Sequence, residues 1–209
     1  MKSAAIPVYQ VDAFADRVFA GNPAAVCPLD DWIDARVMQA IATENNLSET
    51  AFFVPDSQDN ADYAIRWFTP VDEIDLAGHP TLATAHIIFS LLEPARDAVT
   101  FSTRLGDTLR VTREADRLTM DFPARPPQPN DVLGDVAGAL GATPTEVLAS
   151  RDGFAVFNSE AEVAALAPDM AAVAALDCVG LIATAPGDDC DFVSRFFAPK
   201  MGVAEDPVT

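Results

Sequence analysis

One apolar stretch constrains the fold of this chain more than any other feature. Residues 80–92 are hydrophobic on nearly every side of a helical projection. A helix without a polar face is normally buried all round, so we expect 80–92 to lie inside a shell of other elements. Pro80 suits the first helical position, where its missing N–H costs nothing. Gly78 removes a side chain where the backbone turns into the helix.

The start of this helix is a candidate binding site. A buried helix N-terminus offers unbonded N–H groups and the positive end of the helix dipole, both of which suit a carboxylate. His79 lies at this point in the sequence. The alternative interpretation is that Gly78 only forms a turn and His79 is a core histidine. His86, seven residues later on roughly the same face, is expected to be a core histidine as well.

The segments around this helix favour strands. An amphipathic helix with Ile33, Val37, Met38 and Ile41 on one stripe is expected to start at Asp30 or Asp31 and to end at 45–46. A curved, mostly closed sheet around the apolar helix satisfies this pattern. The expected strands are 6–14, 24–29, 50–54, 62–69, 99–103, 108–113 and 118–122.

A proline-rich segment at 123–130 predicts a stiff, extended boundary. The chain is therefore expected to be an α+β protein with two similar domains, 1–124 and 125–209. The second lacks a buried helix comparable to 80–92, so we expect it to be truncated, poorly folded and exposed on its apolar side unless another chain completes it. Its expected helices are 131–141, 144–150 and stretches of 159–175, and its expected strands are 153–158, 178–184 and 190–197.

The composition argues against several classes of partner. A net charge of −19 disfavours nucleic acid and anionic membrane surfaces. No run approaches 18 apolar residues, and the N-terminus lacks the apolar core of a signal peptide. Three cysteines without a C-x-x-C spacing, and only two histidines, argue against a metal site. We expect a cytoplasmic protein whose Cys27, Cys178 and Cys190 are core thiols.

Glu49 begins a β-prone segment, between the hydroxyls of Ser48 and Thr50. A carboxylate at such a place is usually solvated. However, a buried carboxylate can act as an acid/base group that removes a proton beside an activated carbon and returns it elsewhere. An anion held at the helix start would fix the substrate relative to that base. A hydrolase or lyase using His79 is a weaker hypothesis, because no G-x-S-x-G nucleophile turn is present.

Several segments together carry a family resemblance. They are 11–14 with 19–26, 38–42 with 46–52, 66–70 with 73–83, and 195–199 with 205–209. In order and spacing they resemble the PhzF-like phenazine-biosynthesis family, relatives of diaminopimelate epimerase.

The resemblance implies two similar domains, each a sheet wrapped around a central helix, with an active site in the cleft between them. It also implies a homodimer and an isomerase without a cofactor, acting on a small carboxylate-bearing metabolite. By resemblance, Glu49 matches the catalytic acid/base and Gly78 the backbone N–H that holds a substrate carboxylate. The site residues carried over are Glu49, His79 and Asp206 as catalytic and Gly78, Asn22, Pro80 and Thr81 as substrate-binding.

The chain also departs from its apparent relatives. Ala77 stands where diaminopimelate epimerases carry one of two cysteines, which argues against a two-thiol racemase. The Gly-Ser-Ala motif and second buried helix of the PhzF-like family are not present. A catalytically inactive binding or scaffold protein is therefore the alternative function. Arg66 and Arg195 are expected to form structural ion pairs.

Overall fold

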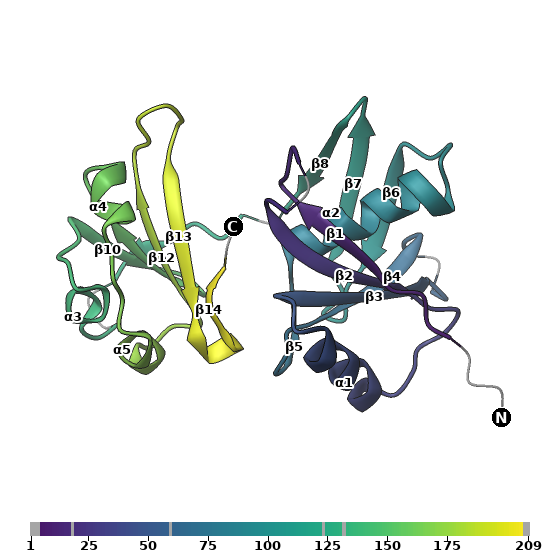
Figure 1. Cartoon of the computed structure of the whole chain (residues 1–209), viewed down its shortest axis with the longest axis horizontal. Coiled ribbons are helices and arrows are strands. Elements are labelled where there is room, and N and C mark those ends of the chain that lie inside the picture. Colours follow the sequence, from purple (N-terminus) through teal and green to yellow (C-terminus); the bar gives the residue numbers. More distant parts are fainter. Residues whose placement is uncertain (1–4, 18, 59, 123, 131–132, 207–209) are drawn as a thin grey trace. The chain divides into compact units, whose positions relative to one another are not determined.

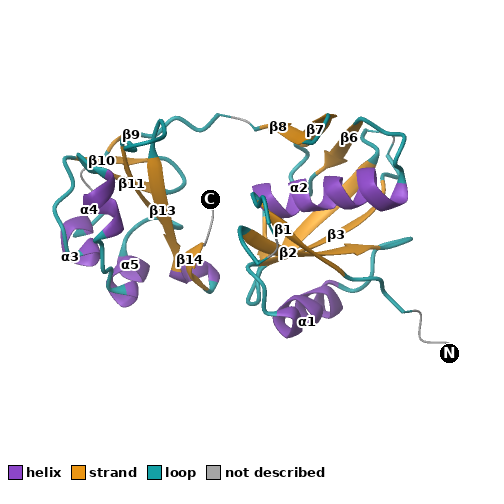
Figure 2. Ribbon diagram, turned by 45° about the horizontal axis from the view of Figure 1, so that its top comes forward, coloured by secondary structure: helices purple, strands orange, loops and turns teal. Residues whose placement is uncertain are grey.

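Residues 78–92 form a helix that lies against one face of a sheet built from the first half of the chain (Figures 1 and 2). The structure is a computed structural model that describes residues 5–206 except 18, 59, 123, 131 and 132. It divides into unit 1, Met1–Pro123, and unit 2, Ala124–Thr209, and each unit is described by itself.

The sheet of unit 1 has eight strands in the order β1-β2-β3-β4-β6-β7-β8, with β5 paired to β4. The pairs β2–β3 and β4–β6 are parallel, and the others are antiparallel. In chain order the elements are β1 Tyr9–Ala13, β2 Asn22–Pro28, α1 Ala35–Asn45, β3 Glu49–Pro55, β4 Tyr63–Phe68, β5 Glu73–Ile74, α2 Gly78–Ile87 with the π-helical turn η1 Ile88–Leu92, β6 Ala98–Ser102, β7 Thr108–Glu114 and β8 Arg117–Asp121.

The central strands are covered on both faces. Successive side chains of a strand point to opposite faces, so Ala51 and Phe53 of β3 pack in the core that contains α2. Phe52 points the other way and packs with Met38 and Ala42 of α1. Figure 2 shows α2 and α1 on opposite sides of these strands. Burial on both faces explains why β3 reads as a continuous apolar run instead of an alternating one.

The buried helix α2 contains hydroxyl groups that bond within the protein. Thr81 Oγ1 donates to the carbonyl of Ala77, and Thr84 Oγ1 donates to that of Pro80, both at 2.7 Å. These bonds offset the cost of burying two polar side chains. Pro80 is the third residue of the helix, not the first as the sequence suggested. It still lies in the first turn, where the backbone N–H groups have no partner within the helix.

Two other expectations for unit 1 need correction. The N-cap of α1 is Asp34, which accepts from the backbone N–H of Arg36 at 2.9 Å, and not Asp30 or Asp31. The expected end is confirmed, because Asn46 caps the helix with a left-handed φ of 51°. The apolar helix is not buried all round, since His86, Leu91 and Leu92 are exposed.

Unit 2 is a six-stranded sheet in the order β14-β13-β12-β11-β10-β9 with short helices on one face. Leu181, Ala183 and Ala185 of one strand point toward the helices and contribute to the core. The elements are β9 Gln128–Pro129, α3 Val136–Leu140, β10 Glu146–Ala149, β11 Gly153–Val156, α4 Glu160–Ala164, α5 Met170–Ala175, β12 Leu181–Ala185, β13 Val193–Ala198, the 3-10 turn η2 Pro199–Met201 and β14 Val203–Asp206.

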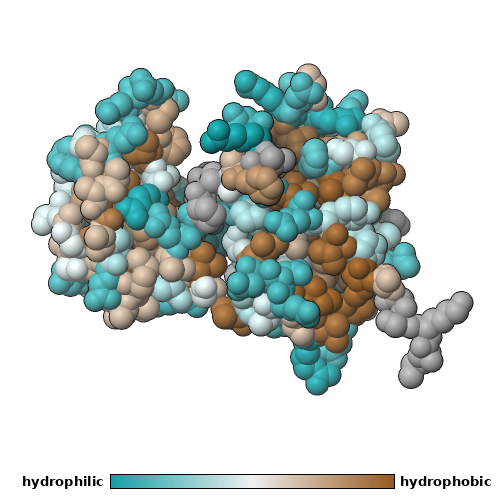
Figure 3. All heavy atoms as spheres, viewed as in Figure 1, coloured by the Kyte–Doolittle hydropathy of each residue, from teal (hydrophilic) through white to brown (hydrophobic). Residues whose placement is uncertain are grey.

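The expected helix at 144–150 is wrong. Residues 146–149 form β10, because they pair with β9 on one side and β11 on the other. Phe154, Ile182 and Thr184 point away from the helices of unit 2 and are half-buried. Most of the exposed large hydrophobic side chains among the described residues belong to unit 1, and only Val179 and Phe192 to unit 2. On the face drawn in Figure 3, the most strongly hydrophobic residues likewise gather on unit 1.

The cysteines differ in their surroundings. Cys27 is fully buried, Cys178 is half-buried and Cys190 is exposed, so the expectation of a core thiol is wrong for Cys190. Burial raises the pKa of the Cys27 thiol to about 12. No helix in the described ranges is long and apolar enough to cross a membrane.

Candidate functional site

The beginnings of β2, β3 and α2 lie close together in unit 1. Strands β2 and β3 are parallel, with Ala24 opposite Glu49, so both strands begin at the same edge of the sheet. The side chains of Asn22, at the start of β2, and Glu49, at the start of β3, both approach His79 in the first turn of α2. Sheet register and helix packing together place these residues side by side, although they are far apart in the sequence.

His79 and Glu49 form the centre of the site. The Nε2 atom of His79 lies 3.2 Å from Oε2 of Glu49, a close polar contact whose angles are not those of a hydrogen bond. His79 is 6% exposed and Glu49 is 7% exposed. Glu49 is therefore a buried carboxylate, and not the solvated strand-entrance residue of the alternative interpretation.

The imidazole of His79 is electrically neutral near neutral pH. Burial lowers its pKa from 6.5 to about 4, and a hydrogen bond to the carbonyl of Pro23 opposes this only in part. The contact with Glu49 is then a contact between a neutral ring and a carboxyl group, and not a salt bridge. A neutral ring carries one N–H donor and one acceptor nitrogen, so the position of its proton decides what it offers to Glu49.

Asn22 contacts the other nitrogen of the His79 ring. Asn22 is fully buried, and its Nδ2 atom lies 3.2 Å from Nδ1 of His79. Its Oδ1 atom accepts a 2.6 Å hydrogen bond from the hydroxyl of Ser48, which also lies 3.3 Å from the carbonyl of Pro23. The sequence interpretation did not assign a role to Ser48. Its position directly before Glu49 was the available signal.

The N-terminus of α2, where an anion site is expected, has no side-chain cap. Ala77, the residue before the helix, carries no side chain that could accept from the N–H groups of the first turn. A Cβ added at Gly78 would lie 3.2 Å from Cζ of Phe122, so the glycine allows this ring to approach the helix start. A carboxylate placed here would meet N–H donors and the positive end of the dipole.

The other residues expected to bind substrate are deeply placed. Thr81 is fully buried; its hydroxyl accepts from Trp67 Nε1 at 3.0 Å and donates to the carbonyl of Ala77. Pro80 is also buried. A direct contact of Asn22, Pro80 or Thr81 with substrate stays a prediction.

Asp206 lies in unit 2. It ends β14, is half-buried and stands opposite Phe196 of β13. Unit 1 therefore brings together Glu49, His79, Gly78 and Asn22, and Asp206 belongs to the other unit. Its part in the site stays a prediction.

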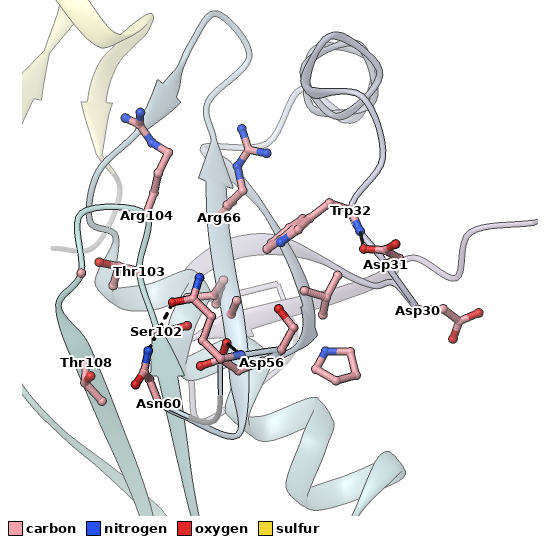
Figure 4. A pocket seen from close by; sticks show the side chains of 17 residues that line it. Asp30, Asp31, Trp32, Asp56, Asn60, Arg66, Ser102, Thr103, Arg104 and Thr108 are labelled. Carbon is pink, nitrogen blue, oxygen red and sulfur yellow. Dashed lines mark hydrogen bonds between the residues drawn. The ribbon is translucent and has the colours of Figure 1, made fainter.

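A separate cavity of about 1100 Å³ lies on unit 1 (Figure 4). Trp32, Arg66 and Arg104 project along one side of it. Arg66 makes two hydrogen bonds to Glu73, of 2.8 and 2.7 Å, and lies over the Trp32 ring, which confirms the expected structural ion pair. Arg104 pairs with Asp75. These cations are thus engaged within the protein.

Among the residues that the structure describes, no group of three or more His, Cys, Asp or Glu side chains is placed to hold a metal ion.

The fold is that of the epimerase-like α+β proteins. The solved structure of a probable proline racemase from Agrobacterium radiobacter superposes on this chain with a TM-score of 0.62 at 12% sequence identity. The superposition covers 97% of this chain and 73% of the racemase. At this identity the likeness concerns the fold alone.

The chain belongs to the phenazine biosynthesis-like protein family, whose pattern matches residues 11–209. It is 52% identical over 204 residues to an uncharacterized isomerase of Pseudomonas aeruginosa, covering 98% of this chain and 77% of that one. A crystal structure of a PhzF-family phenazine biosynthesis protein from Enterococcus faecalis is 48% identical and superposes with a TM-score of 0.87, covering 97% of this chain and 77% of that one. The expected family is therefore confirmed.

Proposed function

We propose that this protein is a cofactor-independent isomerase or epimerase that moves a proton on a small, carboxylate-bearing metabolite. One observation carries the proposal: the buried Glu49 carboxyl group faces the neutral ring of His79, beside the N-terminus of α2. The similarity to an uncharacterized isomerase supports the reaction class.

In the proposed reaction, Glu49 removes a proton from a carbon next to an activating group and returns it to another carbon or another face. General acid–base catalysis by a positioned side chain contributes about 10²–10⁴-fold in rate. The first-turn N–H groups of α2, including that of Gly78, hold the substrate carboxylate near this base. His79 contacts Glu49 and stabilises the form of the carboxyl group that accepts the proton. Asp206 serves as a further polar group.

The direct test is exchange with solvent. The protein is incubated in D₂O with a panel of small cyclic and acyclic carboxylic acids, and deuterium incorporation is followed by NMR. We expect incorporation at one carbon of at least one acid, and a loss of at least 10²-fold in Glu49→Gln. The matched control is Glu146→Gln, because Glu146 also begins a strand but is exposed.

Two outcomes would contradict the proposal. Equal exchange rates in Glu49→Gln and wild type would remove Glu49 from the acid/base role. Saturable binding of a carboxylic acid without exchange in any acid of the panel would favour the alternative, a binding protein that keeps the fold.

A homodimer is part of the proposal. It rests on the resemblance to the family, and light scattering coupled to gel filtration tests it. A mass near twice that of one chain is expected.

A further inference from the structure

A series of close polar contacts leads from Ser48 to Glu49 through unit 1, and the contact between His79 and Glu49 is not aligned as a hydrogen bond. Ser48 Oγ lies 2.6 Å from Asn22 Oδ1, Asn22 Nδ2 lies 3.2 Å from His79 Nδ1, and His79 Nε2 lies 3.2 Å from Glu49 Oε2. Asn22, His79 and Glu49 are buried. Ser48 is half-buried. The series links two residues that are adjacent in sequence through two others from different elements.

The hydroxyl of Ser48 sets the orientation of the Asn22 amide. A hydroxyl has one proton to donate. The carbonyl of Pro23, at 3.3 Å, is a more distant acceptor than Asn22 Oδ1, at 2.6 Å. A separation of 2.6 Å fits an O–H···O bond and is short for an N–H···O bond, so the oxygen of Asn22 faces Ser48 and its NH₂ group faces His79.

The amide orientation then sets the tautomer of His79. An amide NH₂ can only donate, so the Nδ1 atom beside it must accept and carries no proton. A neutral imidazole keeps its single proton on the other nitrogen, Nε2, which is the atom that faces Glu49. A second group also acts on the ring: the Pro23 carbonyl accepts a hydrogen bond from it, which favours the protonated form of His79.

We infer that Ser48 and Asn22 are positioning residues that keep the ring proton of His79 on Nε2, the nitrogen beside Glu49. In this role Asn22 acts through His79 and need not touch substrate. The catalytic part of the inference rests on the proposed function, since it takes Glu49 as the acid/base group. An Nε2–H group beside Oε2 presents a positive partial charge to the carboxylate and favours the ionised form that can accept a proton.

NMR measures the tautomer of His79 directly, without an assay of enzymatic activity. The chain has two histidines, so ¹⁵N-histidine labelling gives only two imidazole signal sets, and His86→Gln assigns them. The ¹⁵N shifts of a neutral ring distinguish its protonated nitrogen from its bare one. We expect His79 of the wild type to carry its proton on Nε2.

Three variants test the control of that tautomer. Ser48→Ala frees the Asn22 amide to turn its oxygen toward Nδ1, and Asn22→Asp presents an acceptor at that position, so both should move the proton to Nδ1. Ser48→Thr keeps the hydroxyl and should keep the wild-type tautomer. If Asn22→Asp does not fold, Ser48→Ala at its half-buried site still decides the question. A wild-type proton on Nδ1, or an unchanged tautomer in Ser48→Ala, would overturn the inference.

The catalytic consequence has its own readout in the deuterium-exchange assay. Ser48→Ala should slow exchange roughly tenfold and move the acidic limb of the pH–rate profile to higher pH. Ser48→Thr keeps the hydroxyl, so its exchange rate and pH–rate profile should match those of the wild type. A Ser48→Ala variant with a changed tautomer but an unchanged profile would contradict the positioning role. If the wild type exchanges no acid, the proposed function fails, while the NMR measurement still decides whether Ser48 and Asn22 control the tautomer.

Discussion

The Nε2 atom of His79 and the Oε2 atom of Glu49 lie 3.2 Å apart in a part of unit 1 where both residues are more than nine-tenths buried. Burial makes each charge costly, so the protonation states of the two groups are linked to the stability of the unit. Glu49 and His79 start different elements, and their contact depends on the register of β2 with β3 and on the packing of α2.

The first prediction concerns pH and stability. The pKa of His79 is lowered from 6.5 to about 4 by burial. Between these pH values the unfolded chain binds a proton that the folded chain does not, so the free energy of unfolding falls as the pH falls through this window. The loss in the free energy of unfolding that is due to His79 reaches roughly 3 kcal/mol at pH 4. His79→Gln should lack this contribution and show a flatter dependence.

Both tryptophans lie in unit 1, so tryptophan fluorescence during urea unfolding follows this unit. The quantity to compare is the difference between variant and wild type at each pH, because the other acidic groups are common to both. His86→Gln, at an exposed position, should keep the wild-type slope. A wild-type slope in His79→Gln would contradict the prediction.

The second prediction concerns the hydroxyl that anchors α2 to β4. Thr81→Val keeps the shape of the side chain but leaves the buried Trp67 Nε1–H without its 3.0 Å acceptor. We expect a loss of about 1–3 kcal/mol in the free energy of unfolding of unit 1, because a buried donor without a partner costs its full desolvation. Urea unfolding followed by circular dichroism measures the loss.

Thr84→Val is the matched control for this change. Thr84 is equally buried, but its hydroxyl donates to the carbonyl of Pro80 in its own helix, so a smaller loss is expected. The double variant Trp67→Phe with Thr81→Val removes donor and acceptor together. It should be more stable than the sum of the two single losses predicts. Additive losses would show that the bond contributes nothing specific.

Local sequence patterns predicted the helix α2 and every strand of unit 1 except the two-residue β5, because apolar periodicity directly reflects the face that a strand or helix buries. They failed for β10: Glu146, Val147, Leu148 and Ala149 also suit a helix, and only pairing with β9 and β11 makes them a strand. The exposure of His86 was missed for a related reason. An apolar helix alone does not reveal where its sheet ends.

Part of the candidate site was also predicted from the sequence, by two different kinds of signal. The family resemblance supplied Glu49 and His79, and the helix start supplied Gly78. The role now inferred for Ser48 could not be derived, since Ser48 and Asn22 are 26 residues apart and their bond exists only once β2 and β3 are in register. The relation of Asp206 to Glu49 depends on the two units together and stays a prediction.

The third prediction concerns Gly78. A Cβ at this position would lie 3.2 and 3.6 Å from two ring atoms of Phe122, which is 40% exposed and can move by the small amount required. We expect Gly78→Ala to change the free energy of unfolding by no more than about 1 kcal/mol, since alanine also favours the helix. Affinity for the acid that exchanges should nevertheless fall at least tenfold, because the new methyl group obstructs the approach of a carboxylate to the backbone N–H groups.

Binding is measured by NMR titration of Glu49→Gln, alone and combined with Gly78→Ala, so that no turnover interferes. A further variant adds Phe122→Leu and tells whether the displaced ring, and not the methyl group, weakens binding. Unchanged affinity in Gly78→Ala would mean that the carboxylate does not bind at the start of α2.

The last prediction concerns unit 2, where Arg195 joins three elements. Its guanidinium donates two hydrogen bonds to Glu205 of β14, of 2.7 and 2.9 Å, and two more to the carbonyls of Val163 and Leu166. The bonds to Glu205 hold the pKa of that carboxyl group below its usual range. Lysine cannot reproduce this planar set of donors. Arg195→Lys should therefore destabilise the packing of α4 and β14 on β13 by about 1–2 kcal/mol, a range that allows for the partial exposure of the ion pair.

Hydrogen exchange followed by mass spectrometry resolves this unit, which contains neither tryptophan nor tyrosine. Peptides that cover Val193–Ala198 should exchange about tenfold faster in the variant, while peptides of unit 1 should not change. Arg151→Lys serves as the control, because Arg151 pairs only with the adjacent Asp152 among its recorded side-chain contacts. Equal protection of β13 in Arg195→Lys and wild type would show that neither the four hydrogen bonds nor the contact of the guanidinium with the Phe197 ring stabilises the sheet.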